Sequence, residues 1–229
     1  MRTVPVQHLH VAEHRALAGT LRGAWPGLPA LLAGSATVCA GATLTVLLAP
    51  GVTPVSVLVA AVLVGPGAAA LARAADDGAT VRQWWLALRE LWRFGLLQCL
   101  VAAAPTAAFL VALRLWQETG ADWLLLSVGA SGAAALFALF ALSVALPLGA
   151  LRPELRGRLL WGCALHLALR RPLRHLAGPC LGVLGVWAAV QWTASLLLLT
   201  PGPAMVVAIA AVRVACATEP ESSDSAARA

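Results

Sequence analysis

Four long stretches without a charged residue constrain this chain more than any other feature of its sequence. They cover residues 28–72, 94–113, 123–151 and 176–212. A helix rises about 1.5 Å per residue, so roughly 20 residues cross a hydrocarbon core of ~30 Å. Of the 229 residues, 60% are apolar and 11% are charged, against about 45–50% and about 25% in soluble domains. The sequence therefore predicts an all-α, polytopic transmembrane helical bundle.

Proline and glycine divide these stretches into five or six spans. The predicted spans are residues 28–49, 54–72, 94–113, 123–148 and 177–199, with a marginal sixth at 204–217. The break before the sixth is placed at residues 200–203, Thr-Pro-Gly-Pro. Arg213 lies within the short sixth segment, which predicts either a tilted span with a snorkelling arginine or a half-inserted helix. Residues 1–27 are expected to be a cytoplasmic segment, and residues 218–229 a disordered tail.

The segment 81–93 has the pattern of an amphipathic helix, for which Thr80 is the expected N-cap. Apolar residues recur there at spacings of three and four, and three arginines are expected on the opposite face. The apolar residues are Val81, Trp84, Trp85, Leu88, Leu91 and Trp92, and the arginines are Arg82, Arg89 and Arg93. Tryptophan opposed to arginine is typical of a helix that lies in the membrane interface. The alternative is a solvated helix that packs on its own protein.

A second amphipathic helix is predicted at residues 155–174, ended or bent by Pro172. Its polar stripe consists of Arg158, His166, Arg170 and Arg174. Its apolar row consists of Leu155, Leu159, Cys163 and Leu167. Both arginine stripes have two functional interpretations, the binding of anionic lipid headgroups and the docking of an acidic cytoplasmic partner. Orientation and anchoring in the membrane alone is the simplest interpretation.

The arginines also predict the orientation of the chain, because basic residues near span ends prefer the cytoplasm. The N-terminal segment carries three arginines, residues 73–93 carry four and residues 152–174 carry six. The turn 50–54 carries none, and residues 114–122 carry one arginine against two acids. If the spans alternate, all three basic segments share one side. We therefore expect a multi-pass protein of the bacterial plasma membrane with a cytoplasmic N-terminus; the absence of Lys, Asn and Tyr suggests a G+C-rich bacterial genome.

Motifs that would carry catalysis are not found. The sequence contains no P-loop, no G-x-S-x-G and no H-E-x-x-H, and the predicted spans hold no Asp or Glu. We expect no enzyme, and no catalytic, cofactor or metal residues. His8, His10 and His14 have a possible metal spacing, but a polar juxtamembrane arm is favoured. The net charge is +6, and the arginines that cause it lie in short runs between apolar blocks. Membrane lipids and not nucleic acid are therefore the expected partners.

Two glutamines are the bulkiest polar residues within the predicted spans, Gln98 and Gln191. An amide in the membrane needs a hydrogen-bond partner, and a bond across two helices contributes about 0.6–2 kcal/mol. Helix packing is favoured over substrate binding for both residues.

Two stretches of the chain resemble the YesL-like bacterial membrane proteins, a family of unestablished function. The first is VGPGAAALARAADDGATVRQWWLALRELWRFGLL and the second is ALPLGALRPELRGRLLWGCALHLALRRPLRHL. The positions that match the first pattern are Gly65, Pro66, Ala68, Leu71, Asp76, Asp77, Trp84, Trp85 and Trp92; those that match the second are Pro147, Leu148 and Pro172. The resemblance implies an accessory role in carbohydrate uptake and supplies no catalytic residues.

Three hypotheses follow for the function. The first is an accessory or assembly component of solute uptake, such as a subunit of a transporter complex, which docks through its arginine-bearing helices. The second is a transporter or permease in its own right, although the carboxylates typical of coupled transport are missing from the spans. The third is a membrane enzyme that acts on a lipid-linked substrate, for which Glu90, Glu154 and His166 are the interfacial candidates.

Overall fold

The computed structural model describes residues 25–77, 79–193 and 195–217, and all regular structure in these ranges is helical. The helices are α2 (Leu28–Leu48), α3 (Pro54–Asp77), α4 (Val81–Thr119), α5 (Leu124–Leu151), α6 (Gly157–Arg170), α7 (Pro172–Gln191), α8 (Leu196–Leu199) and α9 (Pro201–Ala217). Six helical segments of the described chain are long and apolar enough to cross a membrane. The prediction of an all-α, polytopic transmembrane bundle is confirmed.

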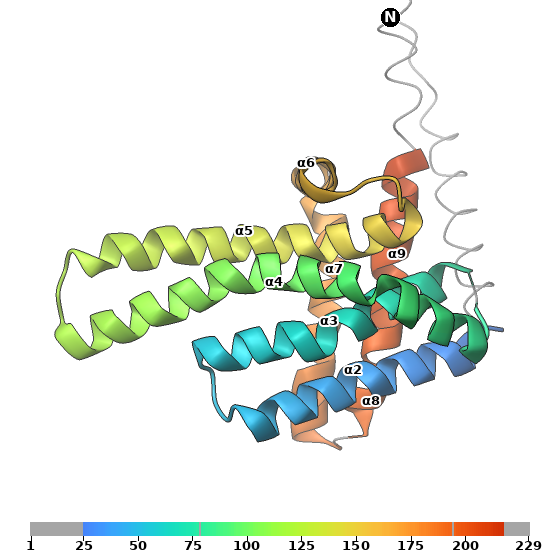
Figure 1. Ribbon diagram of the computed structural model, residues 1–229, viewed down its shortest axis with the longest axis horizontal. Coiled ribbons are helices and arrows are strands. Elements are labelled where there is room, and N and C mark those ends of the chain that lie inside the picture. The colour runs from blue at the N-terminus through green and yellow to red at the C-terminus, as the bar shows by residue number, and fades with distance from the viewer. Residues whose placement is uncertain (1–24, 78, 194, 218–229) are drawn as a thin grey trace, which may run out of the picture.

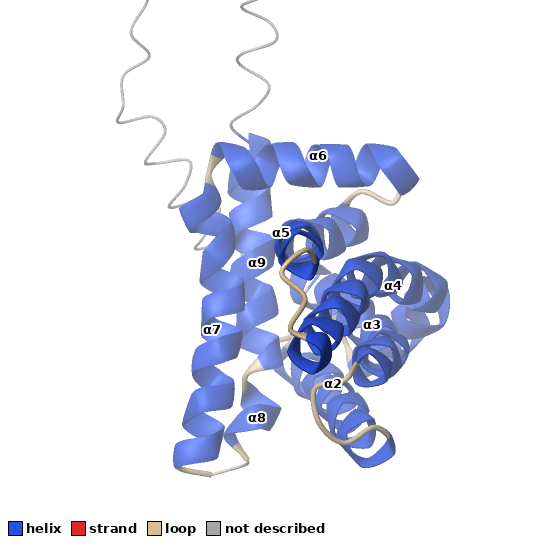
Figure 2. Ribbon diagram, turned by 90° about the vertical axis from the view of Figure 1, so that its left-hand side faces the viewer, coloured by secondary structure: helices blue, strands red, loops and turns tan. Residues whose placement is uncertain are grey.

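The helices run in three directions. Helices α2, α3, α4 and α5 lie side by side, and α7 and α9 run across them (Figure 1). Helix α6 lies across one end of the α7–α9 pair (Figure 2). Buried apolar residues join the two groups, because α9 contributes Val212 to a core with α5 and α6, and Ile209 to a core with α2 and α3.

Large apolar side chains cover the outside of the bundle. Leu126, Val190, Leu47 and Val183 are 82%, 78%, 74% and 72% exposed, and each lies in a candidate span. A soluble monomer rarely exposes contiguous apolar surface on this scale, whereas lipid tails solvate it. Together with the six apolar helices, this surface makes the chain a multi-pass membrane protein.

Helix α4 contains both the predicted amphipathic helix and the predicted third span. Its 39 residues run unbroken from Val81 to Thr119, a length of about 58 Å, roughly twice the hydrocarbon core. Thr80 caps it as predicted: its hydroxyl accepts from the Gln83 backbone N–H, and the Gln83 side chain accepts from the Thr80 N–H. The prediction of a separate helix at 81–93 is wrong, because α4 continues without a break through Arg93 and Phe94 into the third span.

The second amphipathic segment is divided where the sequence predicted an end or a bend. Helix α6 ends at Arg170, and α7 begins at Pro172. Proline has no N–H to donate and therefore favours the first position of a helix. The predicted helix 155–174 is thus too long at both ends, and Arg174 belongs to α7 and not to the stripe on α6.

The fifth span is shorter than predicted and the sixth is longer. Helix α7 ends at Gln191, and the chain reverses at residues 192–195 instead of 200–203. Pro201 occupies the first position of α9, where no backbone donor is lost, and the Ala204 N–H still donates to the Thr200 carbonyl at 3.2 Å. The segment Leu196–Cys216 therefore forms a candidate span of 21 residues, which replaces the marginal segment 204–217.

Candidate functional site at the basic end of the helices

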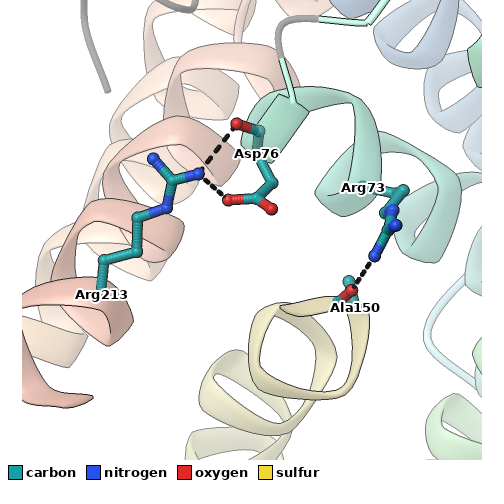
Figure 3. A network of polar contacts seen from close by, with 4 residues as sticks. All are labelled: Arg73, Asp76, Ala150 and Arg213. Carbon is teal, nitrogen blue, oxygen red and sulfur yellow. Dashed lines mark hydrogen bonds and ion pairs between the residues drawn. The ribbon is translucent and has the colours of Figure 1, made fainter. Parts of the chain in front are cut away.

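Two polar contacts tie together the ends of three helices. The Arg73 guanidinium on α3 donates to the Ala150 carbonyl on α5 at 2.8 Å. Arg213 on α9 forms an ion pair with the Asp76 carboxylate on α3, and donates to the Asp76 carbonyl at 2.9 Å. Figure 3 shows both contacts side by side. The predicted snorkelling of Arg213 toward the membrane surface is therefore replaced by a specific contact with α3.

The first third of α4 presents arginine and tryptophan on one exposed face, which we call the Arg–Trp surface. It consists of Arg82, Trp85, Arg89, Trp92 and Arg93, all of them exposed. The Arg89 guanidinium carbon lies 5.4 Å from the Trp85 ring centroid, and that of Arg93 lies 5.2 Å from the Trp92 centroid. Such cation–π contacts contribute about 0.5–1 kcal/mol at exposed sites. The prediction that arginine and tryptophan lie on opposite faces is wrong for these two pairs.

The opposite face of the same segment is packed on its own protein. Trp84 is 7% exposed and joins a core with Ala30 of α2 and with Ala70 and Ala74 of α3. Ala87 is buried beside it along α4. The alternative of a helix that packs on its own protein is therefore the one that the structure supports. Because this packing holds the backbone, the Arg–Trp surface sits on a rigid support.

A pocket of about 290 Å³ lies next to this surface, between the ends of α3, α4 and α5. Its lining includes Arg73 and Glu90, which carry opposite charges, together with Gln83 and Trp84. Arg73 is already bonded to Ala150, and Gln83 completes the cap of α4. Two polar groups of this pocket, those of Arg73 and Gln83, therefore hold the helix ends.

Helix α6 buries a face that is shifted by one residue from the predicted one. The buried residues are Leu160, Ala164, Leu167 and Ala168, whereas Leu159 is 71% exposed and Cys163 is exposed. Of the predicted polar stripe, Arg158, His166 and Arg170 are exposed on α6, and Arg174 is partly buried on α7. The docking of α6 on α5 and α9 decides its buried face, and this docking is not visible in local periodicity.

Gln98 has the cross-helix partner that its place in a span requires. It is 8% exposed, and its carbonyl oxygen accepts a hydrogen bond of 2.6 Å from the Trp161 indole N–H on α6. Trp161 thus serves as a polar link between α6 and α4. Gln191 differs, because it is the exposed last residue of α7.

Other predicted features fall outside the described residues. These are the histidine segment with His8, His10 and His14, the remainder of the N-terminal segment up to residue 24, and the tail 218–229. The structure also brings together residues that no local sequence pattern groups, chiefly the Asp76–Arg213 pair. A spacing of 137 residues leaves no local signal from which this pair could have been found.

Comparison with known proteins adds no relative from which a function could be carried over: no family model, no curated protein and no solved structure matches the chain. The resemblance to the YesL-like proteins remains a prediction from sequence pattern.

Proposed function

We propose that this chain is a non-enzymatic accessory protein of a bacterial plasma membrane that docks an acidic cytoplasmic partner through its arginine-bearing helices. The observation that carries the proposal is the Arg–Trp surface. One face of the segment 81–93 is buried against α2 and α3, while the other presents three exposed arginines. Solute uptake, and carbohydrate uptake in particular, is the process that the YesL-like resemblance suggests for the complex.

The arrangement of the arginines favours a specific partner over simple anchoring. Two of the three guanidinium groups rest on tryptophan rings, which limits the side-chain entropy that is lost when a carboxylate binds. A guanidinium binds a carboxylate through two parallel hydrogen bonds. Arg158 and Arg170 on α6 add exposed positive charge. Complementary charge of this kind increases both the association rate and the specificity of docking.

The proposed orientation follows from the same residues. The connections 78–80 and 152–156 and the arginines beside them would face the cytoplasm, together with the N-terminus. The connections 49–53 and 120–123 would face the other side. The basic end of the helices, which is the end of the bundle at residues 78–80 and 152–156, is then accessible to a cytoplasmic protein.

The test is charge reversal on the Arg–Trp surface. The variant R82E/R89E/R93E should lose a partner that co-purifies with the wild-type chain in mild detergent. R114E is the matched control, because Arg114 is exposed near the opposite end of α4. Equal recovery of the partner with both variants would refute docking at this surface. Solute flux by the purified chain in liposomes would contradict an accessory role and support the alternative, a transporter in its own right.

A further inference from the structure

A second pocket, of about 300 Å³, lies on the other side of the end of α5 and combines an apolar wall with positive charge. Leu148, Leu155 and Leu167 supply the apolar part, and Arg152 and His166 supply polar N–H groups. None of the described residues that line the pocket is Asp or Glu. This composition differs from the pocket beside Arg73, where Glu90 balances the arginine.

The polar groups of this pocket are available to a ligand. Arg152 and His166 are both exposed, and within the described ranges the structure records no side-chain hydrogen bond or ion pair for either. Arg152 is the C-cap residue of α5, so the rigid end of that helix holds its backbone. His166 projects from α6, whose other face is buried against α5 and α9.

The neighbouring surface of α6 is suited to contact with lipid. Leu159 is 71% exposed, and it lies on the same flank of the helix as Cys163 and His166, at spacings of four and seven residues. An exposed leucine beside a polar, basic side chain is typical of a helix at the membrane interface. The pocket therefore lies where an acyl chain and a charged headgroup would meet.

We propose that this pocket binds one anionic phospholipid molecule. The Arg152 guanidinium and the His166 imidazole N–H would donate to the phosphate, and the first part of an acyl chain would lie along Leu148, Leu155 and Leu167. The volume is at the lower end of the range of small-molecule pockets, about 300–1,000 Å³, which suits part of a single lipid. The basic end of the helices is the end that positive-inside orientation assigns to the leaflet rich in anionic lipid. None of the residues of this pocket belongs to the Arg–Trp surface.

Two variants test the two halves of the site, the charged group that would bind the phosphate and the space that would hold the acyl chain. R152Q removes the charge and keeps most of the side-chain volume. G162L fills the pocket: Gly162 lines it, and a Cβ at this position would meet no atom within 4 Å, so the fold has room for the substitution. R114Q is the control for charge. G129L is the control for bulk, because a Cβ at Gly129 also meets no atom within 4 Å.

Binding is measured on the full chain in mild detergent, by native mass spectrometry with added phosphatidylglycerol or phosphatidylcholine. We expect wild-type protein to retain phosphatidylglycerol preferentially. R152Q should weaken retention about five-fold, the value of one arginine near a charged lipid surface; G162L should weaken it at least as much, and both controls should stay within about two-fold. Equal retention of the two lipids, or equal effects of variants and controls, would overturn the proposal. Competition by soluble glycerol 3-phosphate at the same concentration would also overturn it, because the acyl chain would then contribute nothing.

Discussion

Arg213 and Asp76 form an ion pair that joins the end of the last described helix, α9, to the end of α3 (Figure 3). The Asp76 side chain is 11% exposed and the Arg213 side chain is 36% exposed. A charge at the end of an otherwise apolar helix is costly in a membrane unless it reaches water or a partner. The contact with Asp76 provides a partner and couples α9 to the group of four helices.

Breaking this pair should destabilise the fold. We expect D76N and R213Q each to lower the free energy of unfolding by about 1–3 kcal/mol, less than the cost of breaking a fully buried pair because water reaches Arg213. Thermal unfolding in detergent measures the change. In the double variant the losses should be smaller than the sum of the single losses. Strict additivity would show that the two side chains do not interact.

The hydrogen bond between Gln98 and Trp161 should contribute to the docking of α6 on α4. W161F removes the indole donor and keeps most of the ring, and we expect a loss of about 0.6–2 kcal/mol, the range for polar contacts between membrane helices. W187F is the control, because Trp187 is 56% exposed on α7. A loss for W161F no larger than that for W187F would contradict the assigned bond.

Helices α3 and α4 cross at a pair of glycines and should not tolerate a side chain there. A Cβ at Gly65 would lie 2.7 Å from the Gly95 carbonyl oxygen, and a Cβ at Gly95 would collide with the Gly65 carbonyl oxygen. Both obstacles are backbone atoms, so the helices would have to separate. We expect G65A and G95A each to cost about 1–3 kcal/mol. G129A, in open space on α5, should raise helix propensity without a clash; the same loss there would refute the crossing.

The alternation of the helices predicts which connections share a side of the membrane. In a variant with its five cysteines replaced, single cysteines at Val52 and Asp122, which are exposed in the connections between α2 and α3 and between α4 and α5, should react with an impermeant maleimide in intact cells. A cysteine at Glu154, which is exposed beyond the end of α5, should react only after the membrane is opened. Labelling of the cysteines at positions 154 and 122 from the same side of the membrane would contradict this topology.

Much of the local structure could be predicted because its causes are local. The length of each apolar run decides whether a helix can cross a membrane, and six such segments are present. The T-x-x-Q pattern at Thr80 is a capping signal and does begin a helix. Gln98 was expected to need a partner, because an amide within a span has no water to bind. Each inference needs only neighbouring residues.

The sequence by itself thus determined that the chain is helical, apolar and multi-pass, and where α2, α3, α4 and α5 begin to within one residue. Only the tertiary structure decided that residues 81–119 form a single helix, that α6 buries Leu160 and not Leu159, and that Arg213 meets Asp76. The physical reason is that these outcomes depend on helices distant in the sequence. Helical periodicity restricts which residues share a face, but the neighbour that packs against a helix selects the face that becomes buried.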